Sequence, residues 1–82
     1  MKTTWTKGLT PESATEVRKD FQGAAILRRR LKEICEEKIE TSYKVSASKD
    51  SYSNPNWAYL QADARGYERA LNEVISLILG EK

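Results

Sequence analysis

The fold is decided by residues 54–80, which read NPNWAYLQADARGYERALNEVISLILG. At 100° per residue, the apolar side chains of this stretch fall on one side of a helix and most polar ones on the other. Asn54 suits the N-cap, Pro55 the first helical position and Gly80 the position after the last turn. We therefore predict one amphipathic helix over residues 55–79, with an apolar stripe made of Trp57, Leu60, Ala64, Tyr67, Leu71, Val74, Ile75 and Ile78.

A second long helix is predicted over residues 10–41, with Thr10 as its N-cap and Pro11 at its first position. Ser13 and Glu16 also fit a capping box, which would start the helix three residues later. Gly23 inside this pattern indicates a close contact or a slight bend. The apolar stripe recurs with helical spacing and consists of Val17, Phe21, Ala24, Leu27, Leu31, Cys35 and Ile39.

The remaining segments are an arm, residues 1–9, and a serine- and lysine-rich loop, residues 42–54. We expect Trp5 in the arm to fill a pocket on this chain or on a partner. The predicted fold is all-α: a single domain over residues 1–82, built as an antiparallel two-helix hairpin with an N-terminal arm. Two facing stripes rarely bury enough apolar surface to offset the ordering of the chain, so we expect self-association or a partner to complete the hairpin.

Composition narrows the function classes. The 82 residues include one cysteine and no histidine, and the formal net charge is +2. These counts allow no internal disulfide and remove the commonest metal ligand and general base, so we expect no enzyme activity, metal, cofactor or small-molecule substrate. The sequence contains no apolar run long enough for a membrane span or a signal peptide. We therefore expect a cytoplasmic protein that does not enter membranes.

Five residues are candidate interface positions. Trp5, Ile26, Tyr59 and Leu77 are large apolar side chains that lie off the centres of the two stripes or in the arm. Gly66 belongs to a ridge of small residues at four-residue intervals, which permits close approach of another helix. The alternative is that alanine simply favours a helix and Gly66 is tolerated; the other members of the ridge are Ala58, Ala62 and Ala70.

One dense basic cluster, Arg28-Arg29-Arg30 with Lys32, has two interpretations. It could contact the phosphates of a nucleic acid. Alternatively it forms a solvated helix surface with ion pairs at four-residue spacing, such as Arg29 with Glu33. Arg28 itself projects close to the centre of the apolar stripe and must find a partner there. In the predicted hairpin it lies near residues 67–71, so we expect Glu68 or the Tyr67 hydroxyl to bind it.

Residues 52–71, YSNPNWAYLQADARGYERAL, resemble a segment of small accessory proteins of tailed bacteriophages. The shared features are an Asn-Pro-x-Trp helix start, a Gln-Ala pair, a glycine in mid-helix and an Ala-Leu pair. The resemblance implies a phage origin and carries no functional residues.

Together these observations predict a small, non-enzymatic protein–protein interaction module. It would be accessory to or part of the virion, and would occupy a surface of itself, a phage protein or a host protein. The alternative is nucleic-acid binding through Arg28, Arg29, Arg30 and Lys32.

Overall fold

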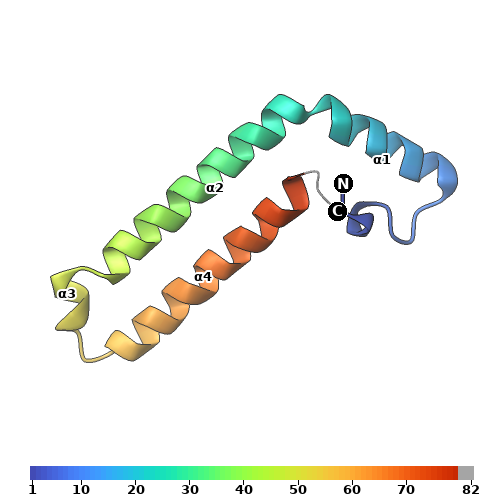
Figure 1. The fold of residues 1–82 in the computed structure, drawn as a ribbon. Coiled ribbons are helices and arrows are strands. Elements are labelled where there is room, and N and C mark those ends of the chain that lie inside the picture. Colours follow the sequence, from blue (N-terminus) through green and yellow to red (C-terminus); the bar gives the residue numbers. More distant parts are fainter. Residues whose placement is uncertain (80–82) are drawn as a thin grey trace.

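The computed structural model describes residues 1–79, apart from the side chains of Lys49 and Ser51. Every regular element in this part of the chain is a helix, which confirms the all-α prediction (Figure 1). The predicted role of Gly80 lies outside the described residues. The elements are η1 (Thr3–Trp5), α1 (Pro11–Gly23), α2 (Ala25–Ser46), α3 (Lys49–Tyr52) and α4 (Trp57–Ile78).

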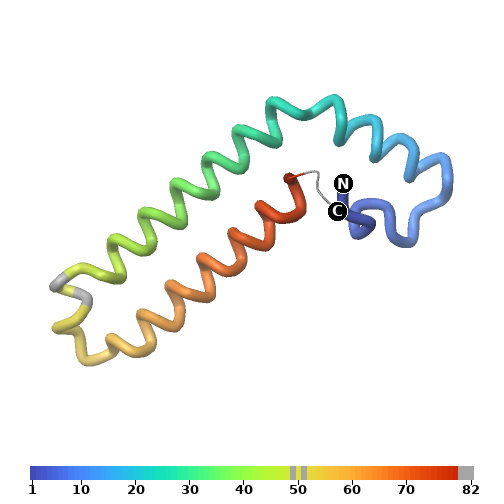
Figure 2. The backbone as a smooth tube through the Cα atoms, viewed as in Figure 1, coloured from blue at the N-terminus to red at the C-terminus, as the bar shows by residue number. Residues whose placement is uncertain are grey.

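Helices α2 and α4 lie side by side and run in opposite directions, joined at one end through α3 (Figure 1). At the other end, α1 leaves the axis of α2 at an angle. The chain path in Figure 2 then shows residues 1–10 folding back, so that η1 lies near the end of α4. The molecule is elongated, with dimensions of 55 × 25 × 16 Å.

The single helix predicted over residues 10–41 is divided at Ala24, whose backbone angles are φ −99° and ψ 25°. Its predicted start is confirmed, because the Thr10 side chain accepts a hydrogen bond from the Ser13 amide and Pro11 follows it. At the break, the Ala24 amide donates to the carbonyl of Phe21, three residues back, and this tightens the last turn of α1. A Cβ on Gly23 would meet no atom within 4 Å, so this glycine accompanies a bend and not a close contact.

The predicted loop over residues 42–54 is largely helical, because α2 continues to Ser46 and α3 follows it. The serines do not unwind the helix, since the Ser46 hydroxyl donates to the Tyr43 carbonyl one turn back (3.1 Å). Helix α4 begins at Trp57, two positions after the predicted start. Asn54 forms a turn before it, with its side-chain oxygen accepting from the Asn56 amide at 2.8 Å.

The core is small. Cys35 of the first predicted stripe is 3% exposed, but Leu31 and Leu60 from the two predicted stripes remain 41% and 40% exposed. Leu31 stays exposed because α2 is rotated about its own axis, so that another side of the helix faces α4. Apart from Ile34, its covered side chains follow alternating spacings of four and three residues, typical of a helix–helix contact line, and this line is displaced from the apolar stripe. The covered line is Arg28, Lys32, Cys35, Ile39, Ser42 and Ser46.

Candidate protein-interaction surface

Arg28 joins the ends of two helices. Its Nε donates to the Phe21 carbonyl at the end of α1 (2.8 Å), and its Nη1 donates to the Ile78 carbonyl at the end of α4 (3.1 Å). The guanidinium also lies 4.0 Å from the centre of the Phe21 ring. Carbonyls at helix C-termini lack helical partners and carry partial negative charge, so a cation is favourable there. Arg28 therefore fixes the position of α1 relative to α4.

The predicted partners of Arg28, Glu68 and the Tyr67 hydroxyl, were wrong. The prediction placed the turn at residues 42–54, whereas α2 extends to Ser46 and α4 starts at Trp57. This moves the turn toward the C-terminus and shifts the pairing of the helices. Arg28 consequently lies opposite Ile78 instead of the middle of α4.

Trp5 fills a site on its own chain, which is one of the two alternatives given by the sequence. Its indole Nε1 donates to the Leu77 carbonyl (2.8 Å), and its ring meets the Phe21 ring edge-on with centroids 5.5 Å apart. Lys2 adds a hydrogen bond to the Ser76 hydroxyl of α4 at 3.1 Å. The arm is thus held against the end of α4, and Trp5 keeps 38% of its surface exposed.

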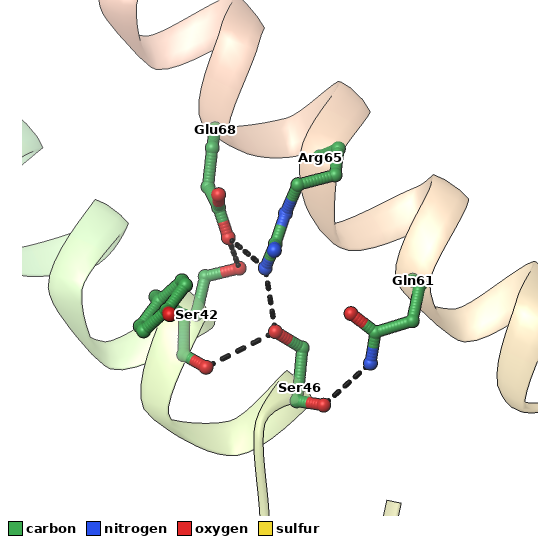
Figure 3. Close-up of polar contacts among 6 residues, drawn as sticks. Ser42, Ser46, Gln61, Arg65 and Glu68 are labelled. Carbon is green, nitrogen blue, oxygen red and sulfur yellow. Dashed lines mark hydrogen bonds and ion pairs between the residues drawn. The ribbon is translucent and has the colours of Figure 1, made fainter. Parts of the chain in front are cut away.

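A polar cluster holds the other end of the helix pair (Figure 3). Glu68 accepts from the Ser42 hydroxyl and from Arg65 Nη2, both at 2.9 Å. Arg65 Nη2 also donates to the Ser46 hydroxyl, and Gln61 donates to the Ser46 carbonyl. These contacts were not predicted. The available sequence signal was residue spacing. Ser42 and Ser46 are four residues apart, and the α4 residues of the cluster are separated by four and then three. Each set therefore lies on one side of its helix.

A groove of about 590 Å³ lies along one side of the α2–α4 pair, in the half nearer α3, where Ser42 and Ser46 of the polar cluster also line it. Its apolar wall is formed by Ile34 and Val45 from α2 and by Leu60, Ala64 and Tyr67 from α4. Leu31 and Val74 continue the same sides of the two helices at helical spacing. We call this surface the open face and define it by Leu31, Ile34, Val45, Leu60, Tyr67 and Val74.

The open face is apolar and substantially exposed. Val45 is 66% exposed and Tyr67 47%, while Val74 is 37% exposed. The opposite side of the helix pair has another composition, because helical geometry places Glu36 of α2 and Asn72 of α4 there, and both are exposed. The two sides therefore differ as the buried and solvated sides of a helical bundle do.

The structure does not gather the predicted interface residues into one patch. Trp5 and Leu77 meet through their hydrogen bond. Ile26 and Tyr59 are 79% and 76% exposed, on sides of α2 and α4 that point away from the helix contact. Gly66 is exposed on α4, with no atom within 4 Å of a Cβ built on it. Instead, the open face contains four residues that the sequence assigned to the apolar stripes, together with Ile34 and Val45, which it did not assign to them. The four are Leu31, Leu60, Tyr67 and Val74.

The basic cluster is also divided. Arg28 is turned inward onto two carbonyls, and Lys32 is half-buried. Arg30 is paired with Glu33 at 3.0 Å, on side chains that are more than half exposed. Arg29, for which the sequence predicted the pair with Glu33, is exposed. Arg29 and Arg30 are thus the members of the cluster that face solvent.

Comparison of the chain with protein-family models, curated proteins and solved structures gives no match. Within residues 1–79, the helices are each too short or too polar to cross a membrane. The same part of the chain brings together no group of three or more cysteine or acidic side chains suited to a metal ion.

Proposed function

We propose that this protein is a non-enzymatic protein–protein interaction module that binds through the open face. The supporting observation is the exposure of apolar side chains from both α2 and α4 along a shared groove. Contiguous apolar surface of this kind marks interaction sites in folded proteins. Association would remove it from water and leave the polar side of the pair solvated. In this proposal α2 and α4 act as one hairpin, and further helices from another chain complete the bundle.

The resemblance of residues 52–71 to accessory proteins of tailed phages supports a biological setting for this proposal. We place the protein in the phage-infected cell, in the host cytoplasm or in the virion. There it would occupy a surface of a second copy of itself, of a phage protein or of a host protein. Such a role needs a stable apolar contact and no chemical step, which agrees with the exposed groove between α2 and α4.

The alternative, nucleic-acid binding, is favoured by the exposure of Arg29 and Arg30. It has less support, because the Arg28 guanidinium is bound to two carbonyls of its own chain and Arg30 is paired with Glu33. Arg29 and the exposed but ion-paired Arg30 give few phosphate contacts, whereas affinity for nucleic acid grows with the number of phosphates neutralised.

Capture of partners from host lysate to which a differently tagged copy of this chain has been added, with and without nuclease, separates the two proposals. The variants are Leu60→Glu on the open face and the double variant Arg29→Glu with Arg30→Glu. We expect captured proteins to be lost with Leu60→Glu, to be retained by the double variant and nuclease treatment, and to change little with salt. Loss of binding in the double variant, with a steep dependence on salt, would support nucleic-acid binding instead.

A further inference from the structure

We propose that a second copy of this chain covers the open face, so that two hairpins related by a two-fold axis form a four-helix bundle. This inference rests on the proposed function, since it names the partner that the open face receives. The copy would contact Leu31, Ile34, Val45, Leu60, Tyr67 and Val74 with the same six residues of its own.

The exposed area of the chain supports a partner of this size. Its solvent-accessible surface is 6521 Å² at a mass of 9.4 kDa. A compact monomer of that mass exposes about 5,000 Å², so the chain exposes roughly 1,500 Å² more. A stable interface of standard size buries about 800 Å² on each partner. The excess therefore exceeds the area that a dimer requires from each copy.

The shape of the open face favours a two-helix partner. Apolar side chains at spacings of three and four residues occur on both helices, as in Leu31–Ile34 on α2 and Leu60–Ala64–Tyr67 on α4. A single helix laid in the groove would leave the outer edges of both stripes in water. A second hairpin presents a matching pair of stripes of the same length, which is how four-helix bundles close their cores.

The charges along the groove are compatible with a two-fold copy. Glu37 and Lys38 are adjacent in the groove wall and have opposite signs. Asp63 lies on the α4 side of the same surface by helical geometry. A two-fold interface places the same charged groups of the second copy along the facing rims. Each rim therefore carries both positive and negative charge. The formal net charge of +2 per chain also gives little repulsion between copies.

Sedimentation equilibrium of the full chain tests the proposal with two open-face variants, Val45→Glu and Leu60→Glu. Val45 is 66% exposed and Leu60 40%, so both variants should retain the helical circular dichroism of the native chain. We expect a native dimer at micromolar concentration and a dimer dissociation constant at least about tenfold higher for each variant, because each dimer carries the substitution twice. The matched controls, Ile26→Glu and Tyr59→Glu, place the same charge on exposed apolar sites outside the open face and should leave the dissociation constant unchanged.

Two results would overturn the proposal. One is a native chain that stays monomeric at about 100 μM, where a complex of micromolar affinity is almost fully formed. The other is an equal loss of dimer in the control variants. A monomer that still captures a host or phage protein through Leu60 would refute the dimer and leave the proposed function intact. A monomer that captures nothing would refute both.

Discussion

At the scale of single residues, Arg28 shows how a charged side chain is accommodated inside an apolar pattern. It lies on the line of α2 that faces α4, yet its guanidinium has two carbonyl acceptors and an aromatic ring beneath it. Both acceptors are at helix C-termini, where a cation offsets partial negative charge. The residue therefore works as a bridge between α1 and α4.

Replacing Arg28 with Met should lower the free energy of unfolding by about 2 kcal/mol, because hydrogen bonds to a charged group are lost at two sites. The measurement is the urea unfolding midpoint. The matched control is Arg29→Met, which removes the same charge from the neighbouring exposed position and should change stability by less than about 0.5 kcal/mol. Equal effects of the two substitutions would show that the bridge contributes nothing.

Glu68 offers a second test, at the other end of the helix pair. Its side chain is 12% exposed and accepts from both Ser42 and Arg65, so Glu68→Ala leaves two partly buried donors without their acceptor. We expect a loss of about 1–2 kcal/mol in thermal or urea unfolding. The control, Glu33→Ala, breaks the exposed pair with Arg30 and should cost about 0.5 kcal/mol or less. A larger cost for Glu33→Ala than for Glu68→Ala would contradict this assignment.

At the scale of elements, helix type and the N-terminal cap of α1 could be predicted because they depend on local signals. Thr10 and Pro11 act within one turn, and the 3.6-residue period identifies a helix without reference to its neighbours. The register of α2 against α4 could not be predicted in this way. It depends on where the turn falls, and the serines of residues 42–46 suggested a loop while their hydroxyls are satisfied by helix carbonyls and α4 side chains.

The candidate site was missed for the same reason. Leu31 and Leu60 belong to clear apolar stripes, and a stripe is normally buried. Which edge of a stripe faces the partner helix is set by the polar contacts at its ends, and those contacts join residues far apart in the sequence. The interface candidates chosen for lying off the stripes, Ile26 and Tyr59, instead lie outside the open face.

Replacing Gly66 or Gly8 with alanine should change the free energy of unfolding in opposite directions. Gly66 lies within α4 with open space around it, so Gly66→Ala should raise the free energy of unfolding by about 0.5–1 kcal/mol through better helix propensity. Gly8 has φ +78°, a conformation that an L-side chain rarely adopts, so Gly8→Ala should lower stability by about 1 kcal/mol.

Thermal unfolding of the two glycine variants against the native chain gives the comparison. Dimer affinity should not change with Gly66→Ala, because Gly66 is outside the open face. If Gly66→Ala abolished association, the ridge of small residues on α4 would be the contact surface, in place of the groove.

At the scale of the whole molecule, the chain is extended for its length. Its radius of gyration is 17.2 Å, whereas a compact domain of this length has about 12 Å. The two ends of the α2–α4 pair are held by polar bridges, and the apolar side chains between them stay accessible. We therefore expect lateral association to bury more apolar surface than end-to-end contact would.

Small-angle X-ray scattering should therefore show a dimer whose longest dimension is well below twice the 55 Å of the single chain while its cross-section increases. End-to-end association would instead give a longest dimension of roughly twice that value, since the helices would be arranged in series. A long, thin dimer would contradict packing through the open face.

The placement of the two tryptophans has a practical consequence. Trp5 packs on Phe21 beside the last turn of α4, and Trp57 stacks on Tyr52 at the first residue of α4, about 33 Å away along the helix. Each indole is therefore an intrinsic fluorophore for one end of the α2–α4 pair. Emission recorded separately from Trp5→Phe and Trp57→Phe chains would reveal whether the two ends unfold together or one after the other.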